Sequence, residues 1–178
     1  MYIWTGMVLP KNFEEKIRNI CRNINKDFNV SEQSFSLPQH ISLKTSFNIE
    51  NYIEVIEYMK ELLKDIKSIN IKVIGISKIN GVIWLDIEEN KQLREIHNTL
   101  NKKLWERFEV PEIKFDGQNF KFHSTLFQDM ESDDKLTDMF PILRKEFEFP
   151  IEFETNKINF GISEVGKVGT YKVIMDDM

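Results

Sequence analysis

The feature of the sequence that most constrains its fold is a loose internal duplication. Each half of the chain has a strand-like segment with the pattern His-x-Ser/Thr-Leu, followed by a helical segment and then by two further strand-like segments. The two motifs are HISL at 40–43 and HSTL at 123–126, so their histidines lie 83 positions apart in a chain of 178 residues. A duplicated fold with a pseudo-two-fold axis would bring the motifs face to face across a central cleft.

The spacing of apolar residues predicts which segments are helices and which are strands. Apolar repeats of three and four positions predict helices at 11–28, 51–66, 90–108 and 132–147, the last of which should kink or split at Pro141. Runs rich in β-forming residues predict strands at 2–9, 40–47, 69–79, 82–87, 119–127, 151–162 and 169–177. Asn80-Gly81 lies between two of these runs and predicts a tight hairpin, which argues against a purely parallel sheet.

The composition is that of an ordinary soluble protein, with 41% hydrophobic and 30% charged residues. A net charge of −5 argues against a protein that coats long nucleic acid, since such proteins are usually basic, but a local site can still bind one phosphate. Cys21 is the only cysteine, which excludes an internal disulfide and a cysteine-based metal cluster, and we expect it to be buried. The sequence shows no signal-peptide pattern and no apolar run of membrane-spanning length, so we expect a cytoplasmic protein.

The motif spacing places polar groups together, because residues i and i+2 of a β-strand point to the same face. Two sets of residues are therefore expected to share a face: His40, Ser42 and Lys44 in one strand, and His123, Thr125 and Phe127 in the other. Each half-site offers an imidazole next to a hydroxyl group on a rigid element. Lys44 would add a positive charge near a bound phosphate.

Two facing half-sites of this kind have the groups that cleavage of a phosphodiester requires. One neutral imidazole removes a proton from the attacking water, and one imidazolium protonates the leaving oxygen. Histidine suits both roles because its ordinary pKa of about 6.5 lies near neutral pH. The hydroxyl groups of Ser42 and Thr125 can bond the non-bridging oxygens as charge develops. Which of His40 and His123 is the base stays open.

Other residues near the motifs have simpler interpretations. Trp4, Phe127 and Tyr171 are the candidates for stacking a nucleobase, as aromatic side chains do in proteins that bind single strands. His97 lies in a helical segment without a partner pattern, so we expect a structural or surface role for it. No carboxylate or cysteine joins the three histidines at ligand spacing, and we expect neither a metal nor another cofactor.

At these motifs the chain resembles the two-histidine (2H) phosphoesterase superfamily, in particular its 2′-5′ RNA ligase-like, cyclic-phosphodiesterase branch. That family is defined by two His-x-Ser/Thr-hydrophobic motifs, matched here by HISL and HSTL. The opening YIWTGMVLP is similar to the family's first strand, and the closing ISEVGKVGTYKVIMDD is similar to its last hairpin. The chain departs from the family at Tyr2 and at Phe127-Gln128, where basic residues are frequent, which favours a smaller substrate than long RNA.

The resemblance implies a bilobal α+β fold with an antiparallel sheet and helices in each lobe, related by a pseudo-two-fold axis around a central cleft. It implies one domain over residues 1–178, made of two intertwined lobes. By position, His40 and His123 would be the acid–base pair, and Ser42 and Thr125 the hydroxyl groups that bind phosphate. The implied reaction is metal-independent hydrolysis or transfer at a 2′,3′-cyclic phosphate or a 2′-5′ linkage of a nucleotide or RNA end.

Several alternatives remain open at the level of the sequence. Within the same class, the enzyme would hydrolyse cyclic dinucleotide or oligonucleotide signals. In a different class, the chain would be a non-catalytic module that binds a nucleotide or an RNA end. RNA 2′-5′ ligation is the reverse reaction at the same site. In each case we expect a monomer that binds neither a membrane nor long double-stranded nucleic acid.

Overall fold

The two motif strands lie at the facing edges of two antiparallel sheets. In the computed structural model, which describes residues 1–174, sheet A has the strand order β2-β1-β7-β8 and sheet B has the order β5-β4-β3-β6. The first sheet contains β1 (Tyr2–Val8), β2 (His40–Asn48), β7 (Ile158–Ser163) and β8 (Lys172–Ile174). The second contains β3 (Ile69–Ile79), β4 (Val82–Ile87), β5 (His123–Gln128) and β6 (Ile151–Thr155).

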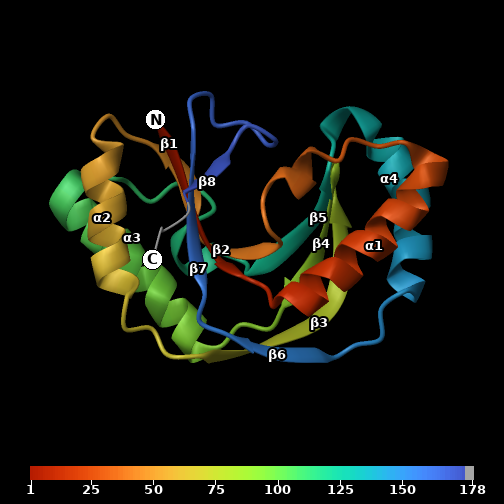
Figure 1. The fold of residues 1–178 in the computed structure, drawn as a ribbon, viewed down its shortest axis with the longest axis horizontal. Helices are drawn as coiled ribbons and strands as arrows, with labels where there is room; N and C mark the ends of the chain where they lie inside the picture. The colour runs from red at the N-terminus through yellow and green to blue at the C-terminus, as the bar shows by residue number, and fades with distance from the viewer. Residues whose placement is uncertain (175–178) are drawn as a thin grey trace.

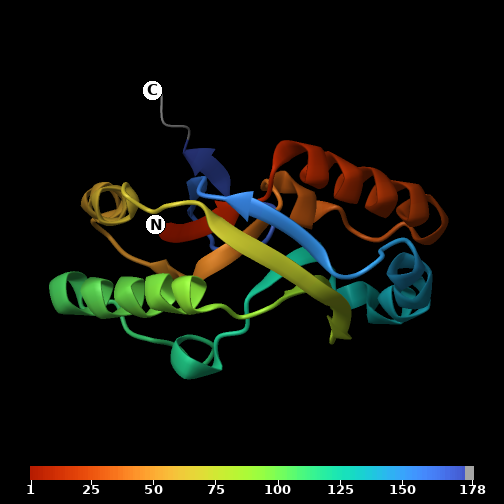
Figure 2. The same ribbon diagram turned by 90° about the horizontal axis from the view of Figure 1, so that it is seen from below.

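Each sheet is covered by two helices, and one helix of each pair is exchanged between the halves. The helix α1 (Lys11–Phe28) connects two strands of sheet A, yet it packs against α4 (Asp133–Lys145), which covers sheet B. In the same way α3 (Lys91–Phe108) connects two strands of sheet B but packs with α2 (Tyr52–Leu63) on sheet A. Figures 1 and 2 show the two helix pairs at opposite ends of the molecule. Each half therefore contributes a helix to the pair that covers the sheet of the other half.

Local signals explain where several elements begin and end. Asn80 and Gly81 both have positive φ angles, of 27° and 76°, and form the predicted two-residue hairpin turn. The side chain of Asn90 accepts a hydrogen bond from the backbone N–H of Leu93 and caps the start of α3. The buried position expected for Cys21 is confirmed, because its side chain is fully covered in the core. Short 3-10 helices also occur in the connections, at Gln33–Ser36 (η1), Gly117–Asn119 (η2) and Met130–Ser132 (η3).

Three sequence-based boundaries are corrected by the structure. The single strand predicted at 151–162 is two strands, β6 and β7, which belong to different sheets because the chain crosses between the lobes at 156–157. Pro141 does not split the last helix, which runs through it from 133 to 145. The predicted last strand at 169–177 is found at 172–174, and its end from 175 to 177 lies outside the described residues.

Both motif strands contain a β-bulge at the leucine of the motif. In β2, Ser42 is opposite Gly6 while Lys44 is opposite Thr5, so Leu43 is an extra residue without a partner of its own. The same shift occurs in β5, where the residues opposite Trp84 and Ile83 are 125 and 127, which leaves Leu126 as the extra residue. The duplication thus extends to the backbone geometry of the motif.

Side chains from the neighbouring connections stabilise the bulged leucines. The backbone carbonyl of Leu43 accepts a hydrogen bond from His97 Nδ1 at 2.8 Å, and that of Leu126 accepts one from Ser34 Oγ at 3.0 Å. His97 is fully buried, and its Nε2 accepts a hydrogen bond from the backbone N–H of Gly117 at 2.9 Å. A ring nitrogen that accepts here leaves Nδ1 as the donor, so His97 is a neutral, structural histidine.

The bulge overturns the expectation that Lys44 faces a phosphate. Because the extra residue inverts the alternation of side chains, Lys44 points into the core, where only 1% of its surface is exposed. Its Nζ is 2.9 Å from Asp116 Oδ2 and 2.5 Å from Asn101 Oδ1. Asp116 also accepts the backbone N–H of Thr45 at 3.1 Å. Burial raises the pKa of Asp116, but the bonds from Lys44 and Thr45 outweigh it and hold the pKa below its usual range.

We predict that Lys44 is required for stability. Replacing Lys44 by Met leaves the Asp116 carboxylate buried without its cation, which should cost about 3–5 kcal/mol in the free energy of unfolding. Urea denaturation followed by circular dichroism measures this loss. The control is Lys102→Met on α3, whose partner Glu106 is 3.8 Å away at the surface, and it should change stability little. Equal effects of the two substitutions would contradict the structural role of Lys44.

Candidate active site

The two motif histidines lie at the seam between the sheets, where β2 and β5 are side by side. A buried hydrogen bond joins the residues next to them: Ser124 Oγ donates to Gln39 Oε1 at 3.0 Å. The backbone N–H of Gln39 in turn donates to Glu14 Oε1 at 3.1 Å, which connects the start of β2 to α1. The seam is therefore held by side chains from both lobes, and His40 and His123 are close enough to interact electrostatically.

Both histidines are oriented by the same backbone contact. His40 Nδ1 is 2.7 Å from the carbonyl oxygen of Pro38, and His123 Nδ1 is 2.8 Å from that of Lys121. A carbonyl oxygen only accepts, so Nδ1 carries the hydrogen in each ring. The second nitrogen, Nε2, is then the one with a free lone pair in the neutral ring and with a transferable proton in the charged ring. Each histidine thus has one defined nitrogen for proton transfer.

The environment shifts the pKa of both histidines downward. Burial lowers the pKa of His40 to about 4, with the Pro38 carbonyl acting in the opposite direction and His123 lowering it further. Burial also lowers the pKa of His123, against the effects of the Lys121 carbonyl and of Asp86. His40 is therefore neutral at pH 7, and the two rings have different electrostatic surroundings although their backbone contacts match.

The hydroxyl groups of Ser42 and Thr125 lie two residues after the histidines, before the bulges, and so point to the same face as the imidazoles. Both side chains are partly exposed. Within residues 1–174 neither hydroxyl has a hydrogen-bond partner. The shared face that the sequence pattern predicts for each histidine and hydroxyl is thus found, and both hydroxyl groups are partly exposed there.

A tryptophan packs beside each histidine, but the two are placed differently. Trp4 lies on β1, 4.3 Å from the ring centre of His40 in an edge-to-face contact, and only 4% of its surface is exposed. Gly6 and Gly161 make room for this indole, since a Cβ on Gly6 would lie 2.5 Å from Trp4 and one on Gly161 would lie 3.0 Å from it. Trp4 therefore supports His40 from below and does not offer an open face to a nucleobase.

On the other side of the seam, Trp84 lies 5.1 Å from the ring centre of His123. Its Nε1 donates to Asp86 Oδ1 at 2.8 Å, and Ser77 Oγ donates to Asp86 Oδ2 at 2.7 Å. Sequence reasoning missed Trp84 and Asp86. Their alternation in VIWLDI shows that they share a face, but only the pairing of β4 with β5 places that face beside His123.

The other two aromatic residues proposed to stack a nucleobase, Phe127 and Tyr171, lie in different environments. Phe127 follows the bulge of β5 and is fully buried, packed 5.3 Å from the ring of Phe35, so the expectation that it stacks on a substrate is wrong. Tyr171 is partly buried, and its hydroxyl is 2.5 Å from Ser46 Oγ on β2. Val173 of β8 is opposite Gly161, which is in turn opposite Trp4. Tyr171 precedes Val173 by two positions and so lies on the same face of sheet A as Trp4 and His40.

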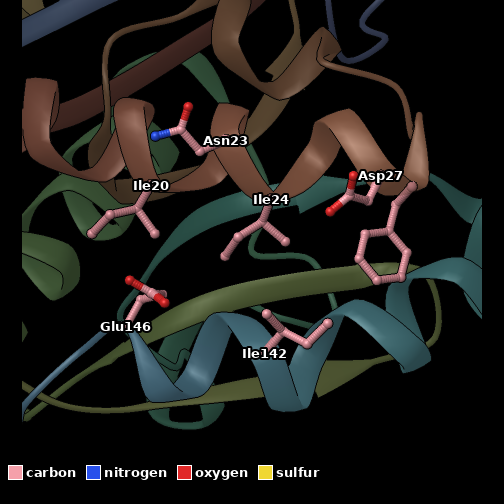
Figure 3. Close-up of a pocket in the computed structure, with 7 residues that line it drawn as sticks. Ile20, Asn23, Ile24, Asp27, Ile142 and Glu146 are labelled. Atoms are coloured by element: carbon pink, nitrogen blue, oxygen red, sulfur yellow. The ribbon is translucent and has the colours of Figure 1, made fainter.

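Two surface hollows lie away from the histidines. One is formed between α1 and α4, with Ile24, Asp27, Ile142 and Glu146 among its lining residues (Figure 3). The other is formed between α2 and α3. Among residues 1–174, no three His, Cys, Asp or Glu side chains form a group that could hold a metal ion. None of the helices in the described part of the chain has the length and apolar character of a membrane span.

Comparison with known proteins identifies the family. The model of the 2′-5′ RNA ligase superfamily matches residues 13–167. The crystal structure of TT0787 of Thermus thermophilus has the same fold, with a TM-score of 0.69, 14% identity, and coverage of 98% of this chain and 96% of that one. No match is found among curated proteins.

A more distant structure is that of Usb1 from Kluyveromyces marxianus, with a TM-score of 0.48, 15% identity, and coverage of 97% and 96% of the two chains. The same protein with uridine monophosphate gives a TM-score of 0.47, 14% identity, and coverage of 97% and 95%. The family match spans most of the chain and includes both histidine motifs. This chain therefore belongs to the 2′-5′ RNA ligase superfamily of two-histidine phosphoesterases.

Proposed function

We propose that the protein is a metal-independent phosphodiesterase that hydrolyses a 2′,3′-cyclic phosphate or a 2′-5′ linkage of a nucleotide or RNA end. The observation that carries this proposal is the matched pair of half-sites. His40 and His123 each present Nε2, and beside them Ser42 and Thr125 each present a hydroxyl that has no hydrogen-bond partner among the described residues 1–174. Membership of the superfamily supports phosphodiester chemistry at these residues.

In the proposed reaction the histidines act as a proton relay around one phosphate. The neutral imidazole takes a proton from water at its Nε2 while the water oxygen forms a bond to phosphorus. The bond from phosphorus to the ribose oxygen breaks, and the charged imidazole gives its Nε2 proton to that oxygen. Ser42 and Thr125 donate to the non-bridging oxygens, where negative charge increases in the transition state. Exchange of one proton with solvent restores the starting charges.

The charge distribution favours a small or terminal phosphate as the substrate. Lys44, the cation expected at the site, is buried and paired with Asp116, so the proposed phosphate contacts are the hydroxyl groups and the imidazoles. The chain as a whole carries a net charge of −5. Binding of a long RNA requires many cationic contacts, whereas one terminal phosphate requires few.

We expect that replacing either His40 or His123 by Ala abolishes most turnover, because each removes one proton-transfer group, worth about 10²–10⁴-fold in rate. Purified protein with EDTA is mixed with 2′,3′-cyclic nucleotides, RNA ending in a cyclic phosphate, 2′-5′ oligoadenylate and cyclic dinucleotides, and the products are separated by chromatography.

The control for this experiment is Asn98→Ala at an exposed position of α3, which should keep full activity. Turnover that persists in both histidine variants would rule out the two-histidine mechanism. Hydrolysis of the cyclic dinucleotides alone would assign the protein to signal degradation, and binding without any turnover would favour a non-catalytic module.

The dependence of kcat/KM on pH should be bell-shaped, with its maximum on the acid side of pH 6.5. The rate rises as pH increases through the pKa of the base and falls as pH increases through the pKa of the acid. Both histidine pKa values lie below the usual value, that of His40 at about 4. Initial rates measured between about pH 3 and 9 test this, and a maximum above about pH 6.5 would contradict it.

Removal of a motif hydroxyl should lower kcat more than it raises KM. We expect Ser42→Ala and Thr125→Val each to reduce kcat by about 10²-fold, because the lost donor acts mainly on the charge of the transition state. The matched control is Ser68→Ala, an exposed serine just before β3, which should leave kcat unchanged. An increase in KM with kcat unchanged would mean that the hydroxyl groups only bind the ground state.

A further inference from the structure

The two half-sites differ at the position directly opposite the histidine on the neighbouring strand. His40 is opposite Val8 of β1, whereas His123 is opposite Asp86 of β4. Val8 is on the same face as Gly6 and Trp4, and Asp86 is on the same face as Trp84, so both positions belong to the face that carries the imidazoles. One histidine therefore has an apolar neighbour and the other has a carboxylate.

The Asp86 carboxylate is held in a fixed orientation. Both its oxygens accept a hydrogen bond, one from Trp84 Nε1 at 2.8 Å and the other from Ser77 Oγ at 2.7 Å. Gly75 is opposite Asp86 on β3, and a Cβ there would be 3.3 Å from Oδ2, so a small residue leaves space for this arrangement. Trp84 and Ser77 are uncharged donors, so they orient the carboxylate without forming an ion pair with it. The carboxylate can therefore interact electrostatically with His123.

The charged groups around the two rings are different. Burial lowers the pKa of His123, and the Lys121 carbonyl and Asp86 on the adjacent strand oppose this effect only in part. On His40, burial has the largest effect, and the charged group that acts on it is His123, which lowers its pKa further. Asp86, directly opposite His123 in the pairing of β4 with β5, thus favours a proton on that ring, whereas Val8 at the matching position opposite His40 carries no charge.

We propose that Asp86 is a positioning residue that keeps the proton of the histidine pair on His123, so that His123 is the general acid and His40 the general base. This assignment rests on the proposed phosphodiesterase function. His40 Nε2 takes the proton of the attacking water, whose oxygen bonds to phosphorus. The bond from phosphorus to the leaving ribose oxygen breaks, and the proton of His123 Nε2 goes to that oxygen. In this proposal Asp86 exchanges no proton with water or substrate itself and acts through His123.

The first test needs no substrate. NMR titration of protein with labelled histidines gives the pKa of His40 and His123 separately, and we expect His123 to have the higher value. Asp86→Asn keeps the shape of the side chain and removes its charge, so the pKa of His123 should fall. Glu88→Gln removes one charge two residues further along, where Glu88 pairs with Lys72 at 3.0 Å, and should leave the pKa of both histidines unchanged.

The second test separates acid from base by the leaving group. Thymidine 3′-(4-nitrophenyl phosphate) loses nitrophenolate, which leaves without a proton, so a general acid is dispensable. We expect His123→Ala to hydrolyse this probe nearly as fast as the wild type, and His40→Ala to remain inactive. Asp86→Asn should lose about tenfold in kcat/KM for a cyclic nucleotide at pH 7, with the alkaline limb of its pH profile moved to lower pH, and should lose little on the activated probe.

A higher pKa for His40 than for His123, an unchanged His123 pKa in Asp86→Asn, or rescue of His40→Ala in place of His123→Ala would each overturn the assignment. If the wild type hydrolyses none of the substrates, the phosphodiesterase proposal fails, while the NMR titration still decides which histidine holds the proton. A folded Asp86→Asn variant with wild-type histidine pKa values and reduced activity would mean that Asp86 acts only on the structure.

Discussion

The site depends on the β-bulge that each motif strand makes at its leucine. Before the bulge, the histidine and the hydroxyl residue share one face of the strand. After it, the alternation is inverted and the next residue enters the core. Lys44 and Phe127 occupy this inward position, one in an ion pair with Asp116 and the other in an aromatic contact with Phe35. The β-bulge in each motif strand thus places the proposed catalytic residues on one face and the residue after the bulge in the core.

Groups from other elements satisfy the backbone at both bulges. His97 of α3 binds the carbonyl of Leu43, and Ser34 of η1 binds that of Leu126. These two segments belong to the connections that are exchanged between the lobes. The same exchange places Gln39 against Ser124 beneath the histidines. Because of this exchange, side chains from one lobe hold the motif of the other lobe in position. The distance between the two histidines therefore depends on how both lobes pack together.

Within this symmetric frame the two histidines are not equivalent. His40 lies against Trp4, which occupies the space left by Gly6 and Gly161, and its surroundings disfavour a proton. His123 lies against a tryptophan that binds a carboxylate. This difference assigns the shared proton to one ring, because with identical surroundings either ring could hold it.

The sequence by itself determined the parts of this protein that depend on local pattern. The two motifs, the amphipathic helices and the Asn80-Gly81 hairpin follow from residue spacing and turn chemistry, and the half-chain separation of the motifs indicated a two-fold arrangement. His40, Ser42, His123 and Thr125 lie before the bulges, where strict alternation still holds, and for that reason their shared face was predictable.

Tertiary structure alone decided the rest. A β-bulge depends on the partner strand and on the side chains that satisfy its backbone, so period-two alternation placed Lys44 and Phe127 on the wrong face. The strand that neighbours each histidine is also a matter of sheet order, and this is why Val8 and Asp86 could not be recognised as the residues that distinguish the two half-sites. Electrostatic surroundings arise from contacts between distant segments, and a linear sequence does not contain those distances.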